Sequence, residues 1–286
     1  MAEHQIDDED DPTDFPNDSF EPRERRPRVR WDDDDVDPEE TTYLAAEHGP
    51  EPVPDWVITA GAARQREHGK LKGGKEAEVF VVERTFGTAR NLLAAKRYRE
   101  HDDRDFRDDS RYRAARRTGD SRADRAVAKG TRRGMRFRGA LWAANEWDVM
   151  RTLWSAGISV PYPVQKLGTE IMLEFCGDDR SAAPRLADAS LDSRTLRSLQ
   201  AQVVDAMFGM VREGVVHADL SPYNVLVWDG RAVLIDFPQA VHPQDGPDAL
   251  ALLQRDVDNL LGWFHRKGVE SDLDALYRRL VAESLA

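Results

Sequence analysis

Two short apolar runs in the second half of the chain predict a β-hairpin. The runs cover Val225–Trp228 and residues 232–235, and they flank Asp229-Gly230. Asp-Gly between such runs is a strong signal for a tight hairpin turn. Polar residues lie just outside both runs, so the hairpin would bring them to the same end.

The polar residues at this end are Asp219, Asn224 and Asp236. Two carboxylates and an amide oxygen suit Mg²⁺, which takes one or two carboxylates and fills its shell with water and phosphate oxygens. In protein kinases a catalytic-loop Asp accepts the proton of the substrate hydroxyl, and an Asn in the spacing D-x-x-x-x-N helps to hold the metal. Asp219 and Asn224 have that spacing, and His217 and Gln239 match in order. The pattern favours a phosphoryl-transfer site over a surface hairpin with solvated acids.

Apolar spacing predicts the elements around this hairpin. Helical periodicity indicates helices over 140–156, 193–212 and 247–263, and a short helix is also expected over 56–67. Asp192 or Ser193 can cap the second of these helices. An alternating run that follows Gly73-Gly74 predicts a strand-turn-strand whose backbone can approach phosphates closely. It is not a Walker loop, because no Gly-Lys-Ser/Thr opens a helix there.

The helix predicted from residue 247 begins soon after Asp236. This leaves no room for a long activation segment with A-P-E, so the peptide-docking surface of ordinary protein kinases is expected to be absent. Arg255 and Asp256 on this helix are predicted to hold the catalytic loop, with a solvated ion pair as the alternative.

Three motifs together resemble the RIO kinases, atypical members of the protein kinase-like fold, and especially their first branch. They are H-A-D-L-S-P-Y-N from His217, I-D-F-P-Q-A-V from Ile235 and G-K-E-A-x-V from Gly74. Ordinary protein kinases have Arg before the catalytic Asp and D-F-G at the metal Asp. This chain has Ala218 and D-F-P at those positions, and its D-F-P-Q is more similar to the second branch.

The resemblance implies an ATP- and Mg²⁺-dependent site. Lys96 follows an apolar run, as the strand lysine of V-A-I-K does, and would reach the nucleotide phosphates. W-A-A-N-E-W resembles the family segment that aligns Glu146 with the acid that holds this lysine. Asn224 and Asp236 would bind Mg²⁺, and Asp219 would be the base or orienting acid. The residues matching the family's nucleotide loop are Gly74, Lys75, Glu76, Ala77 and Val79.

A strand is predicted over residues 171–175, and E-F-x-G at its end resembles the hinge of the family. The resemblance makes Leu173 the gatekeeper and implies that the Glu174 carbonyl and the Cys176 amide bind the adenine edge. Cys176 is the single cysteine, which excludes an internal disulfide and a cysteine-based zinc site. No His or Asn pattern for thiol activation accompanies it, so a hinge role is favoured over a nucleophile.

Charge divides the chain unevenly. Residues 1–58 hold 20 Asp and Glu against 5 Arg, whereas the whole chain has a net charge of -12. We predict that this acidic head is disordered, with an interaction tail for a basic partner as the alternative. Residues 99–139 hold 14 basic and 8 acidic residues and are predicted to form a mobile insertion, which the family also carries. Its acidic interruptions and few aromatics argue against a dedicated nucleic-acid module, although a ribosomal or RNA partner stays open.

The resemblance implies a two-lobed α+β protein kinase-like fold over 59–286. The small lobe would cover about 59–173 and the large lobe about 177–286. No apolar run approaches the ~20 residues that cross a bilayer, and the charged N-terminus lacks the apolar core of a signal peptide. We therefore expect a cytoplasmic protein without a membrane segment.

The function implied by the resemblance is that of a serine/threonine protein kinase, with ATPase activity through an aspartyl-phosphate on Asp236. One alternative is a small-molecule kinase of the aminoglycoside phosphotransferase type, which shares an H-x-D-x-x-x-x-N loop and a metal Asp. The G-K-E-A loop and the long insertion argue against it. A second alternative is an ATP-switched assembly factor with little kinase activity, which the same lysine and metal set would also serve. The sequence does not identify the protein substrate.

Overall fold

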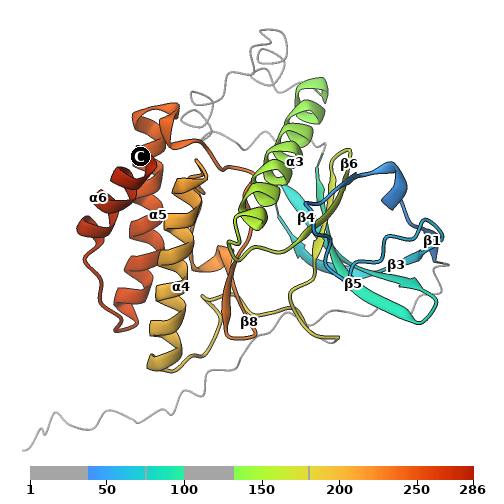
Figure 1. Cartoon of the computed structure of the whole chain (residues 1–286), viewed down its shortest axis with the longest axis horizontal. Coiled ribbons are helices and arrows are strands. Elements are labelled where there is room, and N and C mark those ends of the chain that lie inside the picture. Colours follow the sequence, from blue (N-terminus) through green and yellow to red (C-terminus); the bar gives the residue numbers. More distant parts are fainter. Residues whose placement is uncertain (1–37, 75, 100–131, 180) are drawn as a thin grey trace, which may run out of the picture.

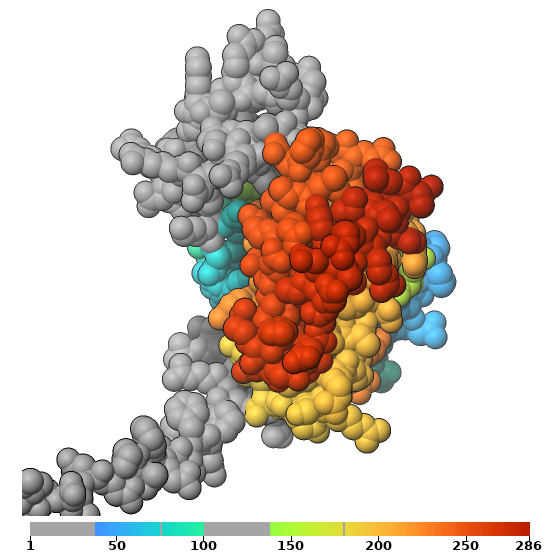
Figure 2. Space-filling model, turned by 90° about the vertical axis from the view of Figure 1, so that its left-hand side faces the viewer, coloured from blue at the N-terminus to red at the C-terminus, as the bar shows by residue number. Residues whose placement is uncertain are grey.

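The structure is a computed structural model that describes residues 38–74, 76–99, 132–179 and 181–286. A curved antiparallel sheet lies at one end with helix α3 (Arg132–Ser155) beside it, and three helices lie at the other end (Figure 1). These are α4 (Ser193–Arg212), α5 (Pro247–Arg266) and α6 (Leu273–Ser284). Seen from the helical side, α5 and α6 form one continuous face (Figure 2). A hairpin of β8 (Val225–Trp228) and β9 (Arg231–Leu234) lies between the two ends.

The large sheet has seven strands in the order β1-β3-β4-β5-β7-β6-β2. Every neighbouring pair is antiparallel, and β3, β4 and β5 form a meander. Side chains alternate between its faces, so Val81 and Val82 on β4 belong to different apolar clusters. The strands are β1 (Glu39–Glu40), β2 (Glu47–His48), β3 (Arg64–Gly73), β4 (Ala77–Phe86), β5 (Ala89–Tyr98), β6 (Pro163–Leu167) and β7 (Glu170–Glu174).

Residues 38–58 are part of the fold, so the prediction that residues 1–58 are disordered is wrong for this segment. Its strand β1 pairs with β3 at one edge of the sheet, and β2 pairs with β6 at the other. Between and after these strands, Tyr43 and Val57 are buried against Val82 and Leu93. The prediction failed here because it rested on the many acids of the head and not on these few apolar side chains. The rest of the prediction, for residues 1–37, lies outside the described residues.

A buried arginine ties this segment to the sheet. Arg84 on β4 donates to the Ile58 carbonyl oxygen at 3.2 Å and to Gln165 Oε1 at 2.6 Å. Gln165 on β6 in turn donates to Thr42 Oγ1 at 2.9 Å. Burial lowers the pKa of Arg84 to about 10. Its hydrogen bonds therefore offset part of the cost of a buried cation, which helps to fix the segment's position.

One further predicted element is absent, and the start of another differs from the prediction. Residues 56–67 do not form a helix, because β3 begins at Arg64 and pairs with β4. Helix α3 begins at Arg132 rather than at residue 140, so the last part of the predicted insertion 99–139 is helical. The predicted mobility of residues 100–131 lies outside the described residues.

Two other predicted elements are confirmed. They are hairpin β8–β9 and helix α4, whose cap Asp192 accepts a hydrogen bond from the Thr195 N–H at 2.7 Å.

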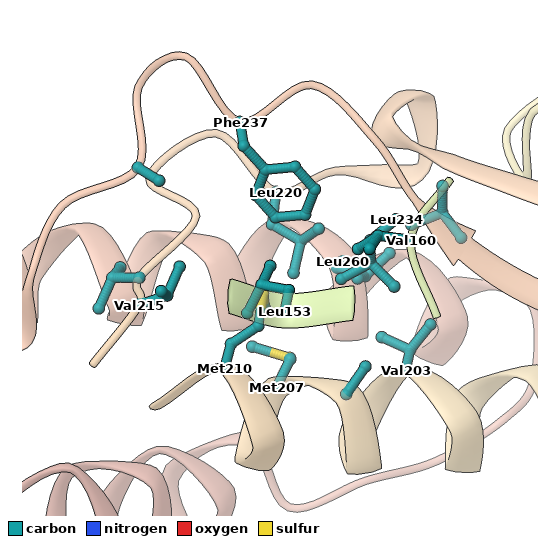
Figure 3. Packing of buried hydrophobic residues seen from close by; sticks show 14 of the residues in the cluster. Leu153, Val160, Val203, Met207, Met210, Val215, Leu220, Leu234, Phe237 and Leu260 are labelled. Atoms are coloured by element: carbon teal, nitrogen blue, oxygen red, sulfur yellow. The ribbon is translucent and has the colours of Figure 1, made fainter. Parts of the chain in front are cut away.

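One apolar cluster joins the sheet to the helices. Leu153 from α3 lies in the same cluster as Val203 and Met207 from α4 and Leu260 from α5 (Figure 3). All four side chains are fully or almost fully buried. This shared core fixes the two ends of the molecule around the space between them. Among the described residues, no helix is long and apolar enough to span a bilayer.

Tyr43→Ala tests whether the N-terminal segment contributes to folding. Tyr43 is only 5% exposed, so its loss should lower the free energy of unfolding by about 3–5 kcal/mol. The control is the neighbouring Leu44→Ala, whose side chain is 74% exposed and which should change stability by less than about 0.5 kcal/mol. Urea unfolding of both variants gives the comparison, and equal small effects would show that the segment is not held by its core contacts.

Candidate active site

A cavity of about 380 Å³ lies between the sheet and the β8–β9 hairpin. This volume suits a small-molecule ligand. Leu173 and most of the predicted site residues line it, but Lys75 lies outside the described residues. The predicted residues that line it are Gly74, Glu76, Ala77, Val79, Lys96, Glu146, Glu174, Cys176, Asp219 and Asp236.

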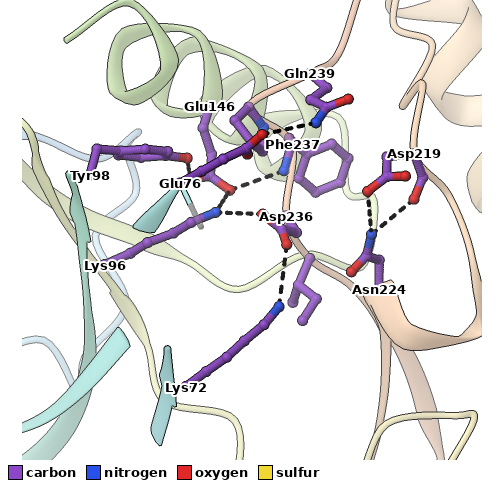
Figure 4. A network of polar contacts seen from close by, with 12 residues as sticks. Lys72, Glu76, Lys96, Tyr98, Glu146, Asp219, Asn224, Asp236, Phe237 and Gln239 are labelled. Carbon is purple, nitrogen blue, oxygen red and sulfur yellow. Dashed lines mark hydrogen bonds and ion pairs between the residues drawn. The ribbon is translucent and has the colours of Figure 1, made fainter. Parts of the chain in front are cut away.

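A buried ammonium group between two carboxylates forms the inner wall of the cavity. Lys96 Nζ donates to Glu146 Oε1 at 2.6 Å and to Asp236 Oδ1 at 2.7 Å (Figure 4). Burial opposes the charge of Lys96, but Asp236 and Glu146 outweigh it and raise the pKa of the lysine. Burial likewise opposes the charge of Asp236, but Lys96 and then Lys72 outweigh it and lower the pKa of that carboxyl. Lys96 and Asp236 are therefore charged at neutral pH.

Glu146 holds more than the lysine. Its Oε1 also accepts from the Phe237 N–H at 3.0 Å, and its Oε2 accepts from the Tyr98 hydroxyl. One carboxylate on α3 thus connects β5 with the segment that carries Asp236. The sequence reasoning did not include Tyr98, although its position two residues after Lys96 places both side chains on the same face of the strand.

The catalytic-loop residues meet beside this cluster. Asn224 Nδ2 donates to the Asp219 carbonyl oxygen at 2.9 Å and to Asp219 Oδ2 at 3.3 Å. The His217 ring contacts the Ile235 carbonyl oxygen through Nε2 at 3.1 Å, which joins the loop to the end of the hairpin. Burial raises the pKa of Asp219, and the charge of Asp236 acts in the same direction, while His217 and Arg255 oppose it. The predicted Asp219–Asn224 pair is thus brought together next to Asp236.

Two site residues have backbone conformations that non-glycine residues rarely adopt. Ala218 has φ 66° and Asp236 has φ 77°, and such conformations persist where the surroundings determine them. Asp256 on α5 accepts from the Ala218 and Leu220 N–H groups at 2.8 Å each, and Arg255 donates to the Ala218 carbonyl oxygen. The prediction that Arg255 and Asp256 tie this helix to the loop is therefore confirmed. Burial raises the pKa of Asp256 to about 7.

Asn145 holds the segment after Asp236. Its Nδ2 lies within 3.4, 3.0 and 3.2 Å of the carbonyl oxygens of Phe237, Pro238 and Ala240. The sequence reasoning missed this residue. The available signal was an Asn inside a helix, where Asn is unfavourable unless its side chain has a specific partner.

At the predicted hinge, the Cys176 side chain is buried and that of Glu174 is half-buried. The Glu174 carboxylate accepts from the Tyr162 N–H at 3.1 Å, and the Cys176 carbonyl oxygen accepts from the Ala183 N–H at 2.8 Å. Burial raises the pKa of the Cys176 thiol, and the charge of Glu174 adds to this effect. An activated nucleophile needs a lowered pKa, so the environment of Cys176 fits a structural residue. The adenine contacts of Glu174 and Cys176 stay a prediction.

The donor set fits Mg²⁺ that is shared with a nucleotide. The nitrogen of the Asn224 side chain donates to Asp219, so its oxygen is the atom that would contact a cation together with the Asp236 carboxylate. Among the described residues no group of three His, Cys, Asp or Glu side chains could hold a metal. The protein would thus supply few ligands and phosphate oxygens or water the others, as is common for Mg²⁺.

The fold of the chain is similar to that of two solved kinase structures. The structure of the Rio2 kinase–ADP/Mg²⁺–phosphoaspartate complex from Chaetomium thermophilum matches with a TM-score of 0.52 and 20% identity, over 76% of this chain and 64% of that one. A second structure of Rio2 kinase from the same organism matches with a TM-score of 0.53 and 22% identity, over 74% and 60% of the two chains. These likenesses confirm the predicted α+β protein kinase-like fold.

Comparison of the sequence with known protein families shows the family of the chain. The RIO domain pattern matches residues 78–276, and the chain belongs to this family. Serine/threonine-protein kinase RIO1 of Caenorhabditis elegans is 34% identical over 202 residues, which are 70% of this chain and 37% of that protein. RIO-type serine/threonine-protein kinase Rio1 of Haloferax volcanii is 33% identical over 211 residues, 73% of this chain and 67% of that protein. The chain thus spans little more than a third of the C. elegans relative.

Asp256→Asn tests how the catalytic loop is held. The amide can accept one of the two N–H groups but turns its own NH₂ toward the other, so the free energy of unfolding should fall by about 1–3 kcal/mol. Asp258→Asn is the matched control, because Asp258 is exposed on the same helix and accepts a hydrogen bond from Gln254 Nε2 at 3.0 Å. Chemical denaturation measures both. A loss in the control as large as in Asp256→Asn would contradict the assigned contact.

Proposed function

We propose that this chain is a RIO-type serine/threonine protein kinase that uses ATP and Mg²⁺. The observation that carries the proposal is the position of Lys96 between Glu146 and Asp236 on the wall of a nucleotide-sized cavity. Membership of the RIO domain family supports it, as do relatives that are named serine/threonine-protein kinases. The same family match favours this function over an aminoglycoside phosphotransferase-type kinase.

Each polar residue of the site has a role in this proposal. Lys96 binds the nucleotide phosphates, and Glu146 fixes its ammonium group. Asn224 and Asp236 would hold Mg²⁺, which would neutralise phosphate charge. Asp219 lies beside Asn224, where it orients the substrate hydroxyl and accepts its proton. Phosphoryl transfer asks for positioning and charge stabilisation more than for covalent chemistry, which a rigid cluster of this kind supplies.

The remaining walls accept the rest of the nucleotide. Leu173, Glu174 and Cys176 line the cavity at the end of β7, where the backbone of the last two binds the adenine edge. Ala77 and Val79 line it from β4. Gly74 turns the chain back, with its N–H bonded to the Ala77 carbonyl oxygen at 2.9 Å. The loop therefore brings backbone close to the phosphates.

The substrate is a protein hydroxyl in this proposal. Only residues 237–246 separate Asp236 from α5, so the chain has no long segment there for docking an extended peptide. Recognition therefore depends on a folded partner surface rather than on a short linear motif. A ribosomal or RNA partner and a cytoplasmic location stay predictions.

An ATPase route through Asp236 belongs to the same proposal. The Rio2 kinase structure from C. thermophilum is named as a phosphoaspartate complex with ADP and Mg²⁺. In this chain an oxygen of the Asp236 carboxylate would attack the γ-phosphorus of ATP, and the bond to the β,γ-bridging oxygen would break to release ADP. Water would then hydrolyse the acyl phosphate and regenerate the carboxylate. Such a cycle would also serve an ATP-switched assembly factor.

Asp219→Asn and Lys96→Met should separate binding from transfer. Asp219→Asn should lower the rate of phosphoryl transfer by about 100- to 10,000-fold with ATP affinity retained, because it removes the proton acceptor. Lys96→Met should weaken ATP binding and transfer together. Asp188→Asn, at an exposed position away from the cavity, should behave as wild type. Calorimetric ATP titration and single-turnover transfer from radiolabelled ATP provide the readouts. Wild-type turnover in Asp219→Asn would contradict the role of Asp219 as proton acceptor.

The aspartyl-phosphate is tested by its chemistry. After incubation with Mg²⁺ and γ-labelled ATP, hydroxylamine should release label from the denatured chain, because it cleaves an acyl phosphate but not a phosphoserine. Asp236→Asn should lose the hydroxylamine-sensitive label. If all label on the wild-type chain resists hydroxylamine, Asp236 acts as a metal ligand only.

A further inference from the structure

Lys72 reaches the active-site cavity because of an irregularity in strand β3. Lys70 pairs with Phe80 and Lys72 pairs with Val79, so Leu71 is one extra residue opposite β4. In a regular strand, residues two apart share a face. A bulge of one residue breaks this alternation and redirects a side chain. Leu71 and Lys72 both line the cavity, whereas Lys70 pairs with Glu78 on the other face of the sheet.

The side chain of Lys72 extends to the proposed metal ligand. Lys72 Nζ lies 3.6 Å from Asp236 Oδ2, while Lys96 Nζ is bonded to Oδ1 of the same carboxylate (Figure 4). The two lysines therefore approach Asp236 from different sides. Their surroundings differ: the Lys96 side chain is 10% exposed and also held by Glu146, but that of Lys72 is 41% exposed. Lys72 can therefore change its partner at low cost.

The nucleotide loop that follows Lys72 makes a second contact, with the segment after Asp236. Gln239 Nε2 donates to Glu76 Oε1 at 3.3 Å. Lys72 and Glu76 stand on either side of Gly73-Gly74. The nucleotide loop is thus placed over Asp236 and Gln239 at both of its ends (Figure 4), so a cation on it lies next to the space where phosphates would bind.

We propose that Lys72 is a phosphate-binding residue of this chain that exchanges its ion pair with Asp236 for contacts with the nucleotide phosphates when ATP binds. The inference rests on the proposed function. Mg²⁺ held by Asp236 would carry the same sign of charge as Lys72, so it would repel Lys72 from this carboxylate. The phosphates bring new negative charge into the same space. The alternative is an exposed ion pair without a role in binding, which would contribute little.

Calorimetric titration of Lys72→Met with ATP and with adenosine, once with Mg²⁺ and once in EDTA, tests the proposal in the full chain. Loss of a hydrogen bond to a charged group should weaken ATP binding by about 10- to 100-fold. Adenosine lacks phosphates, so its affinity should be unchanged. Lys72→Arg should restore most of the ATP affinity. Lys70→Met is the matched control, because its side chain is 42% exposed on the same strand but faces Glu78, and it should leave both affinities unchanged.

Three results would contradict parts of this account in distinguishable ways. Unchanged or tighter ATP binding by Lys72→Met would overturn the inference alone, because the lysine would then serve only as a partner of Asp236. Equal losses for ATP and adenosine would also overturn it, since they would reflect damage to the loop. Absence of ATP binding by the wild-type chain, with and without Mg²⁺, would contradict the proposed function itself.

Discussion

The structure depends on one buried ammonium group held by two carboxylates. Burying charged groups such as Lys96 and Glu146 is costly, and only close geometry with further hydrogen bonds offsets that cost. Glu146 meets this requirement by accepting from Lys96, Tyr98 and the Phe237 N–H at once. The contacts come from strand β5, helix α3 and the segment after hairpin β8–β9. The relative positions of these elements are therefore linked to the charge of a single lysine.

Helix α5 also holds the site in place. The unusual backbone of Ala218 is held by Asp256 and Arg255 from α5, and α5 itself is anchored in the apolar cluster that also contains α3 and α4. Strain of this kind persists where the surroundings fix it. The catalytic loop and the Lys96 cluster are thus supported from opposite ends of the molecule and meet at Asp236. Preorganised charges are what phosphoryl transfer requires from a protein.

Local patterns predicted most of the site, and tertiary contacts account for what was missed. The β8–β9 hairpin and α4 were predicted because Asp-Gly and the Asp192 cap act within a few residues. Lys96, Glu146, Asp219 and Asp236 were predicted because family motifs keep their spacing. Tyr98 and Asn145 were missed because their roles come from partners 48 and at least 92 residues away in sequence. Residues 38–58 were assigned to the disordered head because average composition does not show that Tyr43 and Val57 find a buried surface on the sheet.

The central claim is that Lys96 and Glu146 act as one unit in nucleotide binding. A double-mutant cycle of Lys96→Met and Glu146→Gln, with ATP affinity measured at fixed Mg²⁺, tests it most directly. Each single change should weaken ATP binding, and the double variant should bind about as well as Lys96→Met alone, because Glu146 acts through the lysine. The coupling free energy should then be at least about 1 kcal/mol. Additive losses in the double variant would contradict the account, since the two residues would then contribute to nucleotide binding independently.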